Sequence, residues 1–138
     1  MSNKFINFLI TFLSPMILSA QSKALDCSGI REGIFYFYPL KSQEKFIVIR
    51  NGSMQREINT RTSDTSLWKV YWVNDCVLNL KFIRSSQSIS NAQKSFLNSH
   101  VTVVQVLGIT KDYYVFKGGL DSISRINSTI DTVWLKPR

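Results

Sequence analysis

Three polar side chains that could act together, Arg50, Gln55 and Glu57, flank a predicted hairpin loop at residues 51–52. Alternation along two paired strands places them on one face, beside apolar neighbours. A charged pair in that setting could orient a ligand inside a small β-barrel. The simpler interpretation is a structural ion pair on the surface of the hairpin, and the sequence allows both.

Catalytic chemistry has little support in the sequence. His100 is the single histidine, and it adjoins Ser99 at the edge of a predicted strand, where a solvated surface residue is the usual outcome. Glu57 and Asp64 are the nearest separated carboxylates, but strand periodicity assigns them to opposite sides or to different elements. No nucleophile elbow, phosphate-binding glycine loop, zinc-protease helix or dinucleotide fingerprint occurs. We therefore expect a protein that is not an enzyme and needs no cofactor.

The first 24 residues have the three parts of a secretory signal peptide. Lys4 gives the positive start, residues 5–18 form a mostly apolar run, and small residues follow. The run is shorter than the roughly 20 residues of a membrane-spanning helix, so we expect cleavage rather than anchoring. The small-residue pattern favours cleavage after Ala24 over cleavage after Ala20.

The expected mature protein is one exported domain, residues 25–138, located in the periplasm or outside the cell. Asp26 directly precedes Cys27, which is not the pattern of a lipid-anchored protein. We therefore expect no lipid tether and no membrane span after cleavage. Export would also place Cys27 and Cys76, the only cysteines, where disulfides form, so we predict that they are bonded. Their spacing does not fit zinc ligands, and no metal site is predicted.

The charge of the chain is basic, with 17 Lys and Arg against 9 Asp and Glu, a net charge of +8. Loss of Lys4 and Lys23 with the leader would reduce this to +6. A basic surplus often marks binding to nucleic acid, but here the basic residues are spread singly with acids between them. We expect no nucleic-acid partner and interpret the charge as a property of an exported surface.

Short β-rich runs alternate with turn residues about every ten positions from residue 33 onward, which predicts an all-β antiparallel meander. The eight predicted strands are 33–38, 45–50, 53–61, 66–74, 76–84, 101–109, 113–117 and 129–136. Because closure protects strand edges, we expect a small barrel, with a two-sheet sandwich as the alternative.

The core face is clearest in the fifth run, where Leu78, Leu80 and Phe82 point the same way. The fourth run is apolar on both faces, so it should lie centrally or line an apolar cavity. Trp68 and Trp72 in that run are therefore candidate ligand contacts.

The hairpin at residues 51–52 has two possible core faces. Asn-Gly is the strongest short hairpin signal, because a type I′ turn needs positive φ at both central positions. A two-residue loop there would pair Arg50 with Ser53 and Val48 with Gln55. The isoleucine-bearing face, with Ile47, Ile49 and Ile58, looks more like core than the arginine-bearing face, but alternation alone leaves the choice open.

Other turn signals are weaker. Residues 74–75 and 111–112 predict turns, and the glycines at 118–119 should end the seventh strand. A Ser-, Asn- and Gln-rich stretch between the fifth and sixth strands carries Ser90 with Gln93 three positions later. This capping pattern could begin a short helix through Phe96 and Leu97, so we expect either a long loop or one helical turn at the surface.

Four stretches of the chain form a recognisable combination: Asp26-Cys27, Gly33 to Phe35, Arg50 to Glu57, and Lys69 to Cys76. Together they resemble a family of short, uncharacterised exported proteins of bacteroidete-type bacteria, many of them lipoproteins. The resemblance implies paired cysteines and a small, lipocalin-like β-barrel. It brings no established activity and no catalytic residues.

The sequence therefore predicts a non-catalytic exported module that binds a small apolar or amphipathic ligand. The alternative is an envelope interaction, inhibitor or structural protein whose partner is an envelope protein. The candidate ligand-binding residues are Arg50, Gln55, Glu57, Trp68 and Trp72.

Overall fold

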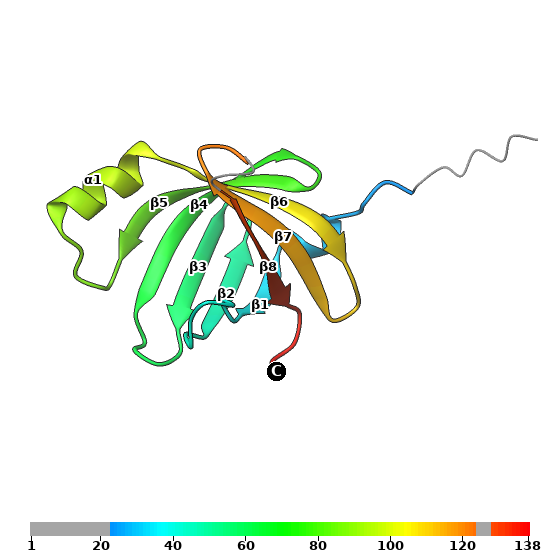
Figure 1. Ribbon diagram of the computed structural model, residues 1–138, viewed down its shortest axis with the longest axis horizontal. Coiled ribbons are helices and arrows are strands. Elements are labelled where there is room, and N and C mark those ends of the chain that lie inside the picture. Colours follow the sequence, from blue (N-terminus) through cyan, green and yellow to red (C-terminus); the bar gives the residue numbers. More distant parts are fainter. Residues whose placement is uncertain (1–22, 124–127) are drawn as a thin grey trace, which may run out of the picture.

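The computed structural model describes residues 23–123 and 128–138. Eight antiparallel strands each pair with the next along the chain, and the last pairs with the first, so the sheet closes into a barrel (Figure 1). The elements in chain order are η1 (Ser28–Ile30), β1 (Gly33–Phe37), β2 (Phe46–Asn51), β3 (Met54–Asn59), β4 (Thr65–Asn74), β5 (Val77–Ser85), α1 (Asn91–Ser99), β6 (Thr102–Ile109), β7 (Tyr113–Leu120) and β8 (Ser128–Trp134). The all-β meander and its closure into a barrel are confirmed.

The predicted signal peptide lies mostly outside the described residues, which begin at residue 23, so export and the cleavage point stay predictions. Ala24, the preferred cleavage point, is described and exposed. In the part of the chain that the structure describes, none of the helices has the length and apolar character needed to cross a membrane.

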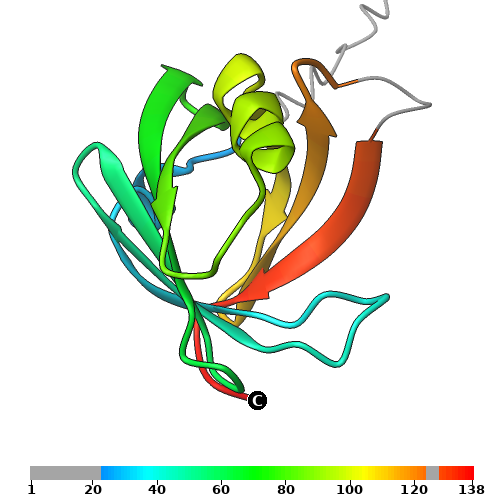
Figure 2. The same ribbon diagram turned by 90° about the vertical axis from the view of Figure 1, so that its left-hand side faces the viewer.

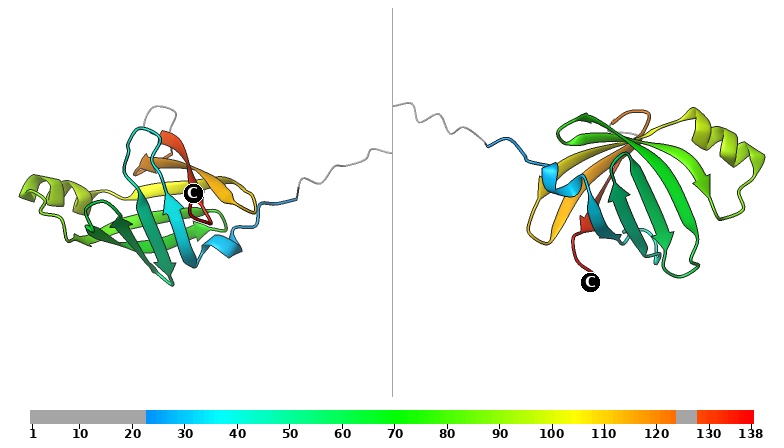
Figure 3. Two further views of the ribbon diagram at one scale, coloured as in Figure 1. Left: turned by 90° about the horizontal axis from the view of Figure 1, so that it is seen from below. Right: turned by 180° about the vertical axis from the view of Figure 1, so that it is seen from behind.

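The two ends of the barrel differ. The tight connections β2–β3, β4–β5 and β6–β7 lie at one end, where η1 packs with the side chain of Ile30 buried. The connections β1–β2, β3–β4 and β5–β6 lie at the other end, and the last of these contains α1. The views in Figure 3 place η1 and α1 at opposite ends of the molecule. We call these the closed end and the open end.

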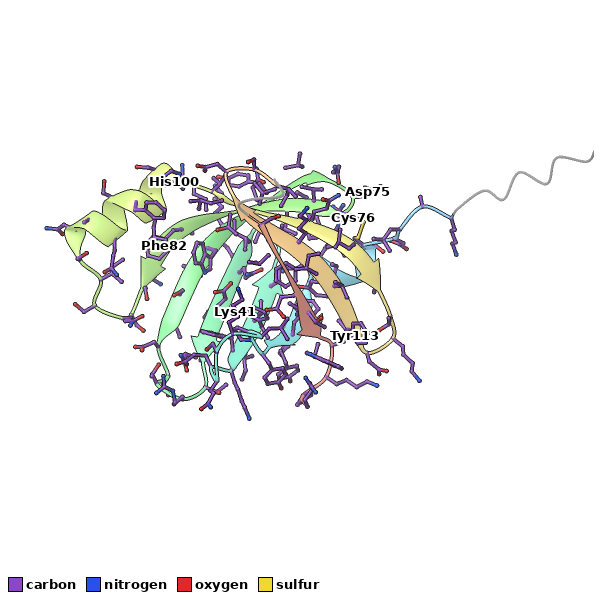
Figure 4. The ribbon with its side chains drawn as sticks, in the orientation of Figure 1. Lys41, Asp75, Cys76, Phe82, His100 and Tyr113 are labelled. Atoms are coloured by element: carbon purple, nitrogen blue, oxygen red, sulfur yellow. A yellow bond between two sulfur atoms is a disulfide. The ribbon has the colours of Figure 1, made fainter. Side chains whose placement is uncertain are left out.

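A disulfide joins Cys27 to Cys76 at the closed end, with their Cα atoms 5.4 Å apart. It links the residue before η1 to the turn between β4 and β5, and Figure 4 shows Cys76 beside Asp75 in that turn, at the far side of the molecule from His100. The predicted bond is confirmed. Closing a loop with a sequence separation of 49 stabilises the fold by ~4 kcal/mol in the chain-entropy description.

The core fills the closed half of the barrel. One buried cluster joins η1 to five strands, and a second lies between β4, β5 and β6. The first contains Cys27, Ile30, Phe35, Val48, Val106, Tyr114 and Val133, and the second Val70, Leu78, Leu80 and Val104. The inward face predicted for β5 is confirmed, since Leu78, Leu80 and Phe82 are all buried.

The hairpin between β2 and β3 differs from the prediction in register. Asn51 pairs with Met54, so the two loop residues are Gly52 and Ser53. Gly52 has a φ of +57°, whereas Ser53 has an ordinary negative φ, which fits glycine at the first central position of a type II′ turn. The register moves by two residues, which keeps every side chain on its predicted face and brings Arg50 opposite Gln55.

The buried face of this hairpin is the arginine-bearing one, so the preference for the isoleucine-bearing face is wrong. Val48, Arg50 and Gln55 are at most 5% exposed. The isoleucines Ile47 and Ile49 lie on the outer surface, where they are half-buried. Polar side chains are tolerated inside because, as described below, they satisfy one another's hydrogen bonds.

Three local predictions also change. The glycines at 118–119 lie within β7 rather than ending it, because they pair with β6 on one side and β8 on the other. The turn predicted at 74–75 is centred one residue later, because Asn74 pairs with Val77. The outer face of β4 is not packed in a core: Val73 is 61% exposed. The capping box of Ser90 and Gln93 is confirmed, and its helix, α1, is longer than one turn.

Candidate functional site

A cavity of about 430 Å³ lies inside the barrel. Its size falls within the ~300–1,000 Å³ of typical small-molecule sites. Most of its wall is apolar, and a smaller set of polar groups interrupts it. The apolar lining includes Phe37, Val48, Leu80, Val104, Phe116 and Val133, and the polar lining includes Arg50, Gln55, Glu57, Thr102, Tyr114, Thr129 and Asp131.

The cavity runs from a buried floor at the closed end to a solvent-exposed rim at the open end. Arg50, Gln55 and Tyr114 form the floor and are each at most 4% exposed. Leu120 and Thr129 lie at the rim and are exposed. Figure 2 views the barrel from the α1 end and shows the strands as a ring with α1 toward one side of it. A ligand would therefore enter from the open end.

Arg50 has most of its hydrogen-bonding capacity satisfied by the protein. Nε and Nη2 donate to Gln55 Oε1 at 2.9 and 2.7 Å, and Nη1 donates to the Ile30 carbonyl at 2.6 Å. Nη2 also lies 3.5 Å from the Tyr114 hydroxyl. The guanidinium carbon is 5.3 Å from the centre of the Phe35 ring, within cation–π range. These contacts come from η1, β1, β3 and β7, so Arg50 ties the closed end together.

Gln55 connects Arg50 to Glu57. Because an arginine can only donate, Gln55 must present its carbonyl oxygen to Arg50 and its NH₂ group elsewhere. That group, Nε2, donates to Glu57 Oε1 at 2.7 Å. The predicted grouping of these three side chains is confirmed, but they form a chain of hydrogen bonds through Gln55. The described residues contain no direct ion pair between Arg50 and Glu57.

The environment of Glu57 changes the pKa of its carboxyl group. Burial in the barrel wall raises its pKa above the ordinary 4.5, since the charged form loses contact with water. The hydrogen bond from Gln55, the nearby Trp68 indole and the charge of Arg50 act in the opposite direction. The Trp68 nitrogen is buried without a partner in hydrogen-bond geometry among the described residues, so its influence is one of proximity. Burial outweighs these groups, and Glu57 holds its proton to higher pH than an exposed glutamate.

Tyr114 sits at the same floor, opposite Arg50. Burial raises the pKa of its hydroxyl, against the lowering effect of the Arg50 charge. The hydroxyl accepts from Arg50, so its own proton is directed elsewhere in the cavity. Tyr114 is therefore a neutral hydrogen-bonding group at ordinary pH.

Two lining features were missed by sequence reasoning. Asp131 lies two positions before the buried Val133 on β8, so the two side chains share the inward face. This spacing was the signal available in the sequence. Gly118 is part of the cavity lining between Phe116 and the rim, and a Cβ there would lie 3.3 Å from the Phe116 ring. Sequence reasoning missed it because the glycine pair at 118–119 does not show which residues of β7 face inward.

The two predicted tryptophans lie beside the cavity rather than in its lining. Trp72 packs against both core clusters, and its ring is 5.8 Å from the Arg50 guanidinium. Trp68 packs edge-on against Phe82, with ring centres 5.4 Å apart, and pairs with Gln55 across β3 and β4. Both support the side chains that line the cavity, and their role as ligand contacts stays a prediction.

The groups considered for catalysis are not brought together. His100 bonds to Asp121 and stacks on Phe96, with ring centres 4.5 Å apart, while the Ser99 hydroxyl donates to a backbone carbonyl of its own helix. Asp64 lies in the β3–β4 connection, whereas Glu57 lines the cavity. Residues 23–123 and 128–138 contain no group of three or more His, Cys, Asp or Glu side chains that could hold a metal ion.

Comparison with known proteins adds no family. No protein-family model matches the sequence, and neither the curated proteins nor the solved structures that were compared give a significant match.

Proposed function

We propose that this protein is a non-catalytic module that holds a small amphipathic ligand, mainly apolar in character, inside its barrel. The observation that carries the proposal is the cavity of about 430 Å³, with apolar walls, a polar floor and an exposed rim. This combination is the usual form of a small-molecule binding site.

The cavity is hard to explain by packing alone. Protein interiors are close-packed, and voids larger than a water molecule are few. Here Gly118 is part of the lining, and a side chain at this position would enter the cavity with its Cβ 3.3 Å from the Phe116 ring. An alkyl chain of eight carbons entering this space would gain about 6 kcal/mol, at ~0.8 kcal/mol for each buried CH₂ group. Part of that gain offsets the entropy lost on binding.

Export to the periplasm or beyond is part of the proposal. The bond between Cys27 and Cys76 supports it, because disulfides persist in oxidising compartments. The alternative predicted from the sequence, an envelope interaction, inhibitor or structural role, is not favoured by any one feature of the described surface, where the exposed apolar side chains come from many different elements.

A fluorescence titration of the folded protein with the neutral apolar dye N-phenylnaphthylamine tests the proposal. We expect saturable, one-site binding to the wild type. Gly118→Val should weaken it at least about tenfold, because the new side chain and the Phe116 ring that it displaces, 3.3 Å from its Cβ, occupy the cavity. β-branched residues suit a strand, and a urea melt of the variant checks that it stays folded. Gly108→Val is the matched control: Gly108 also lies in a strand, is not part of the cavity lining and has open space around it.

Two outcomes would contradict the proposal. One is a wild type that gives no saturable signal although its circular dichroism shows a folded β-protein. The other is equal weakening by the two valine substitutions, because the dye would then not be inside the barrel.

A further inference from the structure

We propose that the ligand of this cavity carries an ammonium group, as an aliphatic primary amine does at neutral pH, and that the Glu57 carboxylate receives it. This inference rests on the proposed function, because it assigns the polar end of the ligand that the cavity would hold.

Arg50, the cationic group that would be expected to bind an anionic ligand, already makes most of its hydrogen bonds within the protein. Its four hydrogen bonds go to Gln55, the Ile30 carbonyl and Tyr114. A guanidinium has five N–H donors, so at most one is left for a ligand. The Phe35 and Trp72 rings also pack near it, with their centres 5.3 and 5.8 Å from the guanidinium carbon. An incoming carboxylate could accept from that one N–H, but a two-point contact would break a bond that Arg50 makes to Gln55, Ile30 or Tyr114.

Of the two carboxylates in the lining, Glu57 accepts one hydrogen bond from a described residue, whereas Asp131 accepts two. The Oε1 atom of Glu57 accepts a hydrogen bond from Gln55, and the buried Trp68 indole N–H, which has no partner in hydrogen-bond geometry, is the second donor that acts on it. A carboxylate has acceptor sites for about four hydrogen bonds, so about two remain for a ligand even when the Trp68 N–H is counted. An ammonium group, with three N–H donors and a full charge, matches that capacity. Gln55 fixes the carboxylate in place because Arg50 in turn fixes the amide.

The balance of charge in the lining favours a cation. When both carboxylates are ionised, Arg50 contributes one positive charge and Glu57 and Asp131 contribute two negative ones, an excess that the empty cavity avoids when Glu57 holds its proton. Asp131 accepts from the Leu40 backbone at 3.2 Å and from the N–H of Thr132, both neutral groups, so its charge is not cancelled by these contacts. With an ammonium ligand, the charges of Arg50, Glu57, Asp131 and the ligand sum to zero. With a carboxylate ligand, the same sum becomes more negative. Unbalanced charge is costly in a largely apolar cavity.

The acidity of Glu57 fits this assignment. Burial raises its pKa in the empty cavity, and an adjacent ammonium would lower that pKa again by favouring the charged form. Binding of an amine should therefore release a proton and weaken as the pH falls. The charged and titratable groups around Glu57 are Arg50 on β2, Tyr114 on β7 and Asp131 on β8. Tyr114 keeps its proton at ordinary pH, because burial raises its pKa.

Calorimetric titration with three ligands of equal chain length tests the inference: octylamine, octanol and octanoate at pH 7. A charge-assisted hydrogen bond contributes ~1.5–3 kcal/mol, so octylamine should bind about ten to a hundred times more tightly than octanol. Octanoate should bind most weakly. When the pH is lowered from 7, octylamine binding should weaken, and titrations in two buffers of different ionisation enthalpy should show increasing proton release.

Glu57→Gln should remove most of the preference for octylamine while changing octanol binding less than about threefold, because the amide that replaces the carboxylate keeps an oxygen that can accept from Gln55. The matched control is Glu32→Gln, which makes the same change in charge at an exposed residue that is not part of the lining. If Glu57→Gln does not fold, the preference and proton release of the wild type still test the inference.

Three results separate the possibilities. Tighter binding of octanoate than octylamine would overturn the inference and assign the head group to Arg50. Equal binding of octylamine and octanol would also overturn it, but the proposed function would stand because the cavity still binds a chain. Absence of binding for all three ligands and for N-phenylnaphthylamine would overturn the proposed function itself.

Discussion

Replacement of Arg50 by methionine tests whether the buried hydrogen bonds of this residue stabilise the fold. Arg50 is 4% exposed and donates short hydrogen bonds to the Ile30 carbonyl and to Gln55 Oε1. Methionine has a similar length and is apolar, so Arg50→Met leaves little empty space but removes all of the N–H donors. The Ile30 carbonyl and Gln55 Oε1 would be left without these donors in the interior. Each such group costs ~1–3 kcal/mol, and release from the burial of a charge offsets part of the sum.

The expected loss in the free energy of unfolding is therefore about 2–5 kcal/mol, a large part of the ~5–15 kcal/mol of a typical domain. The matched control is Arg31→Met. Arg31 also lies over Trp72, at 4.7 Å, and it forms an ion pair with Asp75 at 3.5 Å, but its side chain is 41% exposed. Exposed pairs contribute ~0–1 kcal/mol, so this variant should lose little.

Urea unfolding followed by tryptophan fluorescence measures both variants, and equal slopes with denaturant show that the comparison is of stability alone. The reasoning would be refuted if Arg50→Met stayed within about 1 kcal/mol of the wild type, or if Arg31→Met lost as much. Either result would mean that the buried bonds of Arg50 do not hold the closed end together.

The remaining predictions concern the disulfide, the buried acid and the tight turn. Replacing Cys27 and Cys76 together by alanine should lower the free energy of unfolding by ~4 kcal/mol in urea melts, and a loss below about 1 kcal/mol would contradict the entropic account. Because the folded-state pKa of Glu57 lies above its ordinary 4.5, its contribution to stability is fully present below pH 4.5 and is lost as the pH rises through the folded-state pKa. Glu57→Gln should abolish this fall, so the stability of the variant relative to the wild type should increase from acid to neutral pH, and parallel curves would show that burial does not control the acid. Gly52→Ala should lower the free energy of unfolding by ~1–2 kcal/mol, because φ is +57° there, whereas Gly29→Ala, at ordinary φ with open space around it, should cost less than 1 kcal/mol; equal thermal shifts would refute the turn assignment.

The strands could be predicted from the sequence because their signals are local. Alternation of apolar residues and the spacing of turn residues located all eight, with ends that moved by three residues at most. The largest change, at the end of β7, arises because Gly118 and Gly119 pair with strands on both sides. Pairing across a closed sheet outweighs the weak strand propensity of glycine, and pairing partners are not visible in a local pattern.

The candidate site was predicted only in part because its energetics are not local. Arg50 and Gln55 could be placed on one face, but the choice of face depends on Ile30 and Tyr114, which lie 20 and 64 positions from Arg50. Without those partners an arginine-bearing face looks like surface. Asp131 was overlooked for the same reason, since its place in the same cavity lining as Glu57 follows from barrel closure.

The most direct test of the central claim is the position of a bound chain. Intermolecular nuclear Overhauser effects between octylamine and the protein's methyl groups report which side of the barrel it contacts. Binding in the cavity predicts contacts to Leu80, Val104 and Val133, which line it. Contacts confined to Val73 and Ile130, which are 61% and 57% exposed, would contradict the account by placing the ligand outside the barrel.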